Sequence, residues 1–129
     1  AGLKRAANLA TLLGNADVTH IFASEFKRTQ GTVSFLAKAV KKEVKVISAG
    51  KAMEQLDALK ALPAGSVVVI CGHSNTVPGL VSKLGGKMKN LVDHPKYGPM
   101  LDSKEFNRLF MVTVPGVDGA QVKAVELRY

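Results

Sequence analysis

Two stretches of the chain place a cationic or titratable side chain just after an apolar run, where it can meet a bound anion. In the first, residues 23–29 (ASEFKRT), Ser24 is a natural helix cap and Arg28 follows four residues later. That spacing puts Arg28 on the same helix face, one turn in. Free N–H groups at a helix start and a bidentate guanidinium together suit a phosphate. The alternative is a surface arginine that is solvated or paired with Glu25.

The second stretch, residues 71–76 (CGHSNT), follows another apolar run. Gly72 allows the backbone to approach a ligand closely, and His73 lies where a strand would end and a helix begin. A histidine in this place can hydrogen-bond a phosphoryl oxygen or transfer a proton. Short polar side chains come next: Ser74, Asn75 and Thr76. The alternative is a helix cap beside a solvated histidine.

A serine nucleophile is a third interpretation of the same stretch, because Ser74 lies two residues after Gly72. The nucleophile elbow G-x-S-x-G needs a second glycine, and Thr76 stands in its place. The remaining triad members would have to come from Asp93, His94 or Asp102. The sequence therefore favours a phosphate site over a serine nucleophile.

Alternating helices and strands are expected to position these stretches. Apolar spacing predicts helices over residues 2–13, 25–40, 51–62 and 75–84. Strands are predicted over residues 18–23, 44–47, 66–71, 108–114 and 121–129, the last as an antiparallel edge strand. Residues 87–104 are predicted to be irregular, with turns at residues 115–116 and 118–119.

This order of elements predicts a single α/β domain over residues 1–129, a three-layer α/β/α fold around a mostly parallel, open sheet. Ligands of such sheets bind beyond the carboxyl ends of the strands. Both polar stretches follow predicted parallel strands, so we expect Arg28 and His73 to face one pocket.

The formal net charge of +8 is spread over both halves of the chain and favours an anionic ligand or surface. The densest basic cluster is interpreted as a solvated helix end, because no aromatic residue lies among its members: Lys38, Lys41, Lys42 and Lys45. Only 5% of the residues are aromatic and no nucleic-acid-binding motif occurs, so nucleic acid is not an expected partner. The apolar runs are too short to cross a bilayer, and no membrane partner is expected.

Cysteine and histidine usage gives no sign of a metal or a disulfide. Cys71 is the single cysteine and is interpreted as a small, buried, apolar side chain. The three histidines, His20, His73 and His94, are far apart in the sequence and lack neighbouring ligands. We therefore predict no metal and no cofactor.

The chain resembles the histidine phosphatase superfamily, the phosphoglycerate-mutase-like group, and most of all its short phosphohistidine-phosphatase-like members. The matching stretches, in order, are GLKRA at 2–6 with Leu9, IFASEFKRT at 21–29 with Thr32, VVICGHSNTVP at 68–78, and FNRLF at 106–110. Their order and spacing make the resemblance more specific than any one of them.

The resemblance implies a metal-independent phosphomonoester hydrolase that transfers phosphate to a histidine in an Arg-His-Gly or Arg-His-Ala motif on the first strand. It implies that Arg28 holds the phosphoryl oxygens and that His73 stabilises the transferring group. Further substrate contacts are predicted at Ser24, Ser74 and Asn75. The leaving group would take a proton from a carboxylic acid, for which Glu25 and Asp57 are candidates. The short form lacks the insertions with which mutases enclose their substrates, so hydrolase is favoured over mutase.

The sequence departs from the family pattern at the nucleophile, because none of its histidines follows an arginine. The residues before them are Thr19, Gly72 and Asp93. The resemblance therefore implies an N-terminally incomplete domain without the first family strand, inactive on its own. The neighbouring strands would then have unpaired backbone groups, each costing about 1–3 kcal/mol if buried.

A stable sheet would need a missing N-terminal segment, a rearrangement, or a strand from a homo-oligomer. The expected partners are a phosphorylated small molecule, a phosphoprotein or inorganic phosphate. The alternative function is a non-catalytic member of the same fold that binds phosphorylated ligands or a protein.

Overall fold

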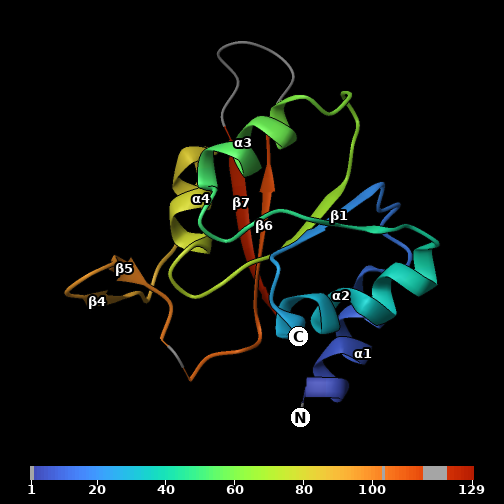
Figure 1. The fold of residues 1–129 in the computed structure, drawn as a ribbon, viewed down its shortest axis with the longest axis horizontal. Helices are drawn as coiled ribbons and strands as arrows, with labels where there is room; N and C mark the ends of the chain where they lie inside the picture. Colours follow the sequence, from blue (N-terminus) through green and yellow to red (C-terminus); the bar gives the residue numbers. More distant parts are fainter. Residues whose placement is uncertain (1, 103, 115–121) are drawn as a thin grey trace. The chain divides into compact units, whose positions relative to one another are not determined.

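The computed structural model of the chain describes residues 2–102, 104–114 and 122–129. The helices are α1 (Gly2–Leu13), α2 (Lys27–Val40), α3 (Ala52–Lys60) and α4 (Val77–Lys83). The strands are β1 (His20–Ala23), β2 (Val44–Val46), β3 (Val68–Cys71), β4 (Val92–His94), β5 (Gly98–Met100), β6 (Arg108–Thr113) and β7 (Lys123–Arg128) (Figure 1). The chain divides into two compact units, the first ending at Gly72 but including Tyr129, and the second covering His73–Arg128. Whether residues 1–129 act as a single domain stays a prediction.

The first unit is built on a parallel sheet in the order β2-β1-β3. Ile21 pairs with Val44 on one side and with Val69 on the other, so β1 is the central strand. Both neighbours run parallel to it, as the predicted alternation of strands and helices requires. The strands are shorter than predicted, because the ladder ends where the chain turns into its connecting loops.

Helices α1 and α2 pack against each other in the first unit (Figure 1). Their apolar residues recur at three- and four-residue steps and are buried: Ala6 and Leu9 in α1, and Val33 and Leu36 in α2. Together with Ile21 of β1, these side chains are at most 3% exposed and form the core of the unit. The bounds predicted for α1 are confirmed.

The end of α2 is closed by a left-handed residue. Lys41 has a φ of 57° and donates its N–H to the carbonyl of Ala37. The N–H of Lys42 donates to the same oxygen over 3.1 Å. This closure turns the chain directly into β2, which begins at Val44.

The second unit contains α4 and two antiparallel hairpins. In the first hairpin, Val92 of β4 pairs with Met100 of β5. In the second, Arg108 of β6 pairs with Arg128 of β7 at one end and Thr113 with Lys123 at the other. The antiparallel orientation predicted for the last strand is confirmed. The turns predicted at residues 115–116 and 118–119 lie outside the described residues.

The prediction that residues 87–104 are irregular is wrong, because β4 and β5 lie within them. Their turn is formed by His94, whose Nδ1 accepts the backbone N–H groups of Lys96 (3.0 Å) and Tyr97 (3.3 Å). Gly98 continues it with a φ of +69°. Pro99 sits opposite Asp93 in a two-stranded ladder, where a missing N–H costs little.

A buried arginine fastens the second hairpin. The side chain of Arg108 is 1% exposed and makes ion pairs with Glu126, through Nε, and with Glu105, through Nη1 at 3.2 Å. Its Nη1 also donates to the carbonyl of Asn90 over 3.1 Å. These partners offset the cost of burying the charge, so Arg108 joins β6, β7 and the segment before β4.

The structure therefore confirms a mixed α/β fold with a parallel three-stranded sheet and antiparallel strand pairs, while the three-layer arrangement stays a prediction. Among the described residues, β3 pairs only with β1, and β6 pairs only with β7. Both strands thus have an edge without a partner strand in this part of the chain. No described helix is long and apolar enough to span a membrane.

Shortening Leu36 to alanine is expected to lower the free energy of unfolding by about 2–5 kcal/mol, because it leaves a cavity in the core of the first unit. Urea denaturation followed by circular dichroism measures the loss. The matched control is Leu12→Ala in α1, whose side chain is 44% exposed and should cost less than about 1 kcal/mol. Equal losses for the two variants would contradict this assignment of the core.

Candidate functional site

The two polar stretches begin at the same end of adjacent parallel strands. Ala23, the last residue of β1, pairs with Cys71, the last residue of β3. Ser24 and Gly72 therefore leave the sheet side by side, as predicted from the order of the elements. This end of a parallel sheet is where loops gather to form ligand sites.

Ser24 is buried and its hydroxyl forms hydrogen bonds within its own loop, so it is not the helix cap that the sequence predicts. Helix α2 begins at Lys27, two residues later than expected, and its N-cap is Phe26. The hydroxyl of Ser24 lies 2.8 Å from that of Thr29, which donates to the carbonyl of Phe26 over 2.8 Å. The hydroxyl oxygen of Ser24 also accepts the backbone N–H of Phe26 over 3.4 Å. The hydroxyl is thus occupied inside the turn, which explains why it does not cap the helix.

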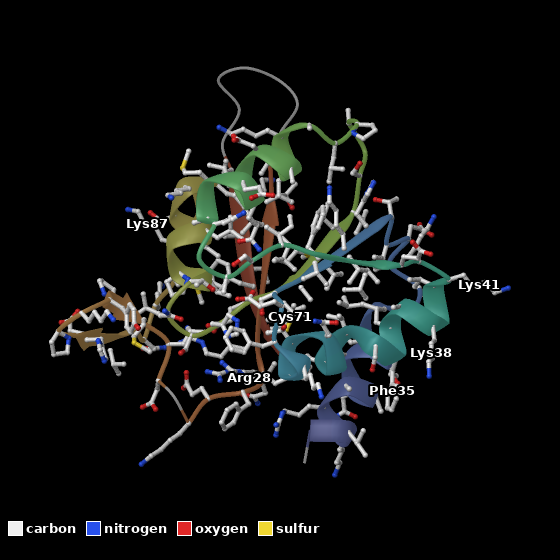
Figure 2. All side chains as sticks on the ribbon, viewed as in Figure 1. Arg28, Phe35, Lys38, Lys41, Cys71 and Lys87 are labelled. Atoms are coloured by element: carbon white, nitrogen blue, oxygen red, sulfur yellow. The ribbon has the colours of Figure 1, made fainter. Side chains whose placement is uncertain are left out.

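Arg28 is the second residue of α2, and its side chain is exposed (Figure 2). Its guanidinium carbon lies 4.5 Å from the centre of the Phe26 ring, which is a cation–π contact. Phe26 supplies no side-chain hydrogen bond to the first turn of α2. An exposed guanidinium therefore stands beside the positive end of a helix dipole, the pair of features that suits a phosphate.

Of the two candidate acids, Glu25 lies next to this corner. Its Oε2 accepts the N–H of Ala49 over 2.8 Å, which ties the chain after β2 to the loop after β1. Asp57 lies in α3 and is exposed. The role of either carboxyl group as a proton donor stays a prediction.

His73 opens the second unit and is half-buried. Its N–H donates to Thr76 Oγ1 over 2.9 Å, and its carbonyl accepts the N–H groups of Thr76 and Val77, each at 3.0 Å. Helix α4 begins at Val77, two residues later than predicted, because residues 74–76 form this turn. The backbone of His73 is therefore fixed in the turn that leads into α4.

The other polar residues of this stretch are half-buried as well. The carbonyl of Ser74 accepts the N–H of Leu101 over 2.9 Å, which joins the loop after β5 to the turn. Asn75 lies within the turn itself. Of the acidic and histidine residues considered for a serine triad, His94 forms the β4–β5 turn, and Asp102 Oδ1 accepts the N–H of Lys104 over 2.9 Å.

Cys71 is a free, half-buried cysteine at the carboxyl end of β3 (Figure 2). Burial raises the pKa of its thiol, and a hydrogen bond with Thr32 offsets only part of that rise. Because the thiolate is the nucleophilic form, a raised pKa makes Cys71 a poor nucleophile at neutral pH. Among the described residues, no group of three His, Cys, Asp or Glu side chains could hold a metal ion.

Arg28 belongs to the first unit and His73 to the second, so the convergence of their side chains on one anion stays a prediction. Thr29 and Thr76, which organise the two corners through their hydroxyl groups, are not predicted from the sequence to do so. A threonine near the start of a helix is a weak signal, because hydroxyl side chains are common at all helix starts.

No protein-family model matches the sequence, and no curated protein matches it. Among solved structures, the fold is similar to that of a mycobacterial glucosyl-3-phosphoglycerate phosphatase, at 14% identity and a TM-score of 0.55, over 64% of this chain and 64% of that protein. It is also similar to mycobacterial hydrolase 1, at 13% identity and a TM-score of 0.61, over 98% of this chain and 83% of that one. It is similar as well to mycobacterial hydrolase 2, at 15% identity and a TM-score of 0.59, over 95% of this chain and 75% of that one.

At such low identities, these likenesses establish a shared fold and nothing about substrate. They agree with the mixed α/β fold that the order of helices and strands predicts. The match spans 64% of the length of the glucosyl-3-phosphoglycerate phosphatase.

Replacing Thr29 by valine is expected to lower the free energy of unfolding by about 1–3 kcal/mol, because the buried Ser24 hydroxyl loses one of its hydrogen-bond partners. Urea denaturation checks the value. The control is Thr11→Val in α1, which removes an exposed hydroxyl that donates to the carbonyl of Ala7. This substitution should lower the free energy of unfolding by about 0.5 kcal/mol. If the two substitutions cost the same, the Ser24–Thr29 pair does not organise the corner.

Proposed function

We propose that this chain supplies the phosphate-binding framework of a metal-independent phosphomonoester hydrolase of the histidine phosphatase type. One observation carries the proposal: the register that pairs Ala23 with Cys71 starts the Arg28 loop and the His73 loop at neighbouring strand ends. His73 lies only two residues beyond Cys71. The net charge of +8 and the fold shared with a known phosphatase support the same conclusion.

In the proposed site, Arg28 holds two phosphoryl oxygens through its guanidinium, and His73 hydrogen-bonds a third. The polar groups of Ser74 and Asn75 complete the contacts, while Ser24 acts indirectly by holding the turn before α2. The substrate is a phosphorylated small molecule or phosphoprotein, and inorganic phosphate is its product and simplest ligand.

The nucleophile of the proposed reaction is a histidine that this sequence does not supply after an arginine. Its ring nitrogen would attack phosphorus as the ester P–O bond breaks, and an acid would protonate the leaving oxygen. Water then cleaves the phosphohistidine. We propose that a strand carrying this histidine comes from an N-terminal segment and pairs with an edge that β3 or β6 offers.

A binding role without catalysis is the second candidate function. It is favoured by one specific feature, the presence of Arg28 and His73 in a sequence where no histidine follows an arginine. The coding sequence upstream of Ala1 separates the two candidates. An in-frame Arg-His-Gly there supports the hydrolase, whereas its absence supports the binding protein.

The purified chain is expected to show no turnover of para-nitrophenyl phosphate, because the attacking histidine is missing from it. The measurement is release of para-nitrophenol over the background of buffer alone. Turnover that the substitution His73→Ala abolishes would show that the chain contains its own nucleophile and would overturn that part of the proposal.

Inorganic phosphate is expected to bind, and Arg28→Ala should raise its Kd about 10- to 100-fold, the value of a charge-assisted bidentate contact. Isothermal titration calorimetry measures both constants. His73→Asn should weaken binding by a smaller factor. The control is Arg128→Ala, which removes the same charge from an arginine in β7 whose Nη2 lies 3.9 Å from Glu105. Equal weakening by Arg128→Ala would mean that phosphate responds only to net charge.

A further inference from the structure

A cavity lies in the first unit, at the opposite end of β1 from Ser24. It has a volume of about 310 Å³ and opens beside the first residue of β1, His20. Its walls come from the start of β1, the turn into β2 and the end of α3. His20 and Ser24 are four residues apart along an extended strand, roughly 13 Å, so a ligand here does not share the Arg28 corner.

The walls combine a flat ring with apolar side chains. His20 and Phe22 lie on the same face of the sheet, because strand residues alternate, and Lys45 is paired with Phe22. The imidazole is fixed by the hydroxyl of Thr19, which lies 2.8 Å from its Nδ1. The end of α3 adds apolar surface from Leu62 and two alanines.

The rim of the cavity carries more positive than negative charge. The lining includes two lysines, Lys42 and Lys45, and one carboxylate, Glu43, so its net charge is +1 with the imidazole counted as neutral. The ammonium of Lys45 lies 5.9 Å from the centre of the Phe22 ring, which is almost fully buried. Lys42 directly follows the left-handed residue Lys41 at the end of α2, and it lines the cavity.

These features select the class of ligand. The net charge of +1 in the lining balances the single negative charge of a monoanion. A phosphate dianion would leave one of its negative charges unbalanced beside Glu43. The volume lies at the lower end of small-molecule sites and suits one ring with one charged group. We propose that this cavity binds a small aromatic carboxylate, with its ring against His20 and Leu62 and its carboxylate between Lys42 and Lys45.

Benzoate is the probe for this site, and the full chain is titrated by ¹H–¹⁵N NMR up to about 20 mM, which covers a millimolar Kd. The expected result is a saturable shift of the amide signals of His20, Phe22, Lys45 and Leu62. Benzyl alcohol, which has the same ring without the charge, should bind at least about tenfold more weakly. Phenyl phosphate should also be weaker at these amides, while shifting those around Arg28.

The matched variants are Lys45→Gln and Lys41→Gln, each of which removes one lysine charge from the same region. Lys45 lines the cavity, whereas Lys41 does not, and its side chain extends outward from the end of α2 (Figure 2). Lys45→Gln should raise the Kd of benzoate about tenfold and Lys41→Gln should leave it within about twofold. Ala58→Leu, which fills the cavity, should abolish the shifts while the circular dichroism spectrum is retained.

Three results would overturn the proposal. One is the absence of saturable shifts at the cavity amides. Another is an equal loss of affinity in Lys41→Gln, which would show a response to net charge alone. The third is benzoate binding that survives Ala58→Leu in a folded protein. None of these results bears on phosphate binding at Arg28, so the two sites are tested separately.

Discussion

The parallel pairing of β1 with β3 is the constraint on which the candidate site depends. Because Ala23 and Cys71 are partners, any shift of register by one residue would move the loop after one strand away from the other. The buried side chains of Ile21 and Phe22, on opposite faces of β1, hold that register in place. The core of the first unit thus contributes to the candidate site by keeping the ends of β1 and β3 aligned.

The sequence predicts the first unit well, since its helices have one clearly apolar face. Helix α1 has its predicted bounds, and the order of parallel strands follows from their alternation with helices. Prediction from the sequence fails where hydrogen bonds between side chains decide where a helix begins. Ser24 resembles a helix cap in sequence, but its hydroxyl is paired with Thr29, and α2 starts at Lys27 instead.

Prediction fails again over residues 87–104, for a different reason. Prolines and glycines there indicate a loop, and strands of three residues are too short to show any alternation. At the site itself, residue types and order identify the two corners, at Arg28 and His73. Whether these corners face one anion depends on how the two units pack together, and such packing leaves no periodic signal in the sequence.

Among the described residues, β3 pairs with a strand on one side only, which affects the hydrogen exchange of its amides. In a parallel strand, successive N–H groups point alternately to the two neighbours, so β1 shields only every second amide of Val68–Cys71. If no further strand pairs with β3, the alternate amides are expected to exchange with solvent as those of an edge strand do. A strand that pairs with the second edge of β3 would therefore lower the deuterium uptake of these alternate amides, whatever the sequence of that strand.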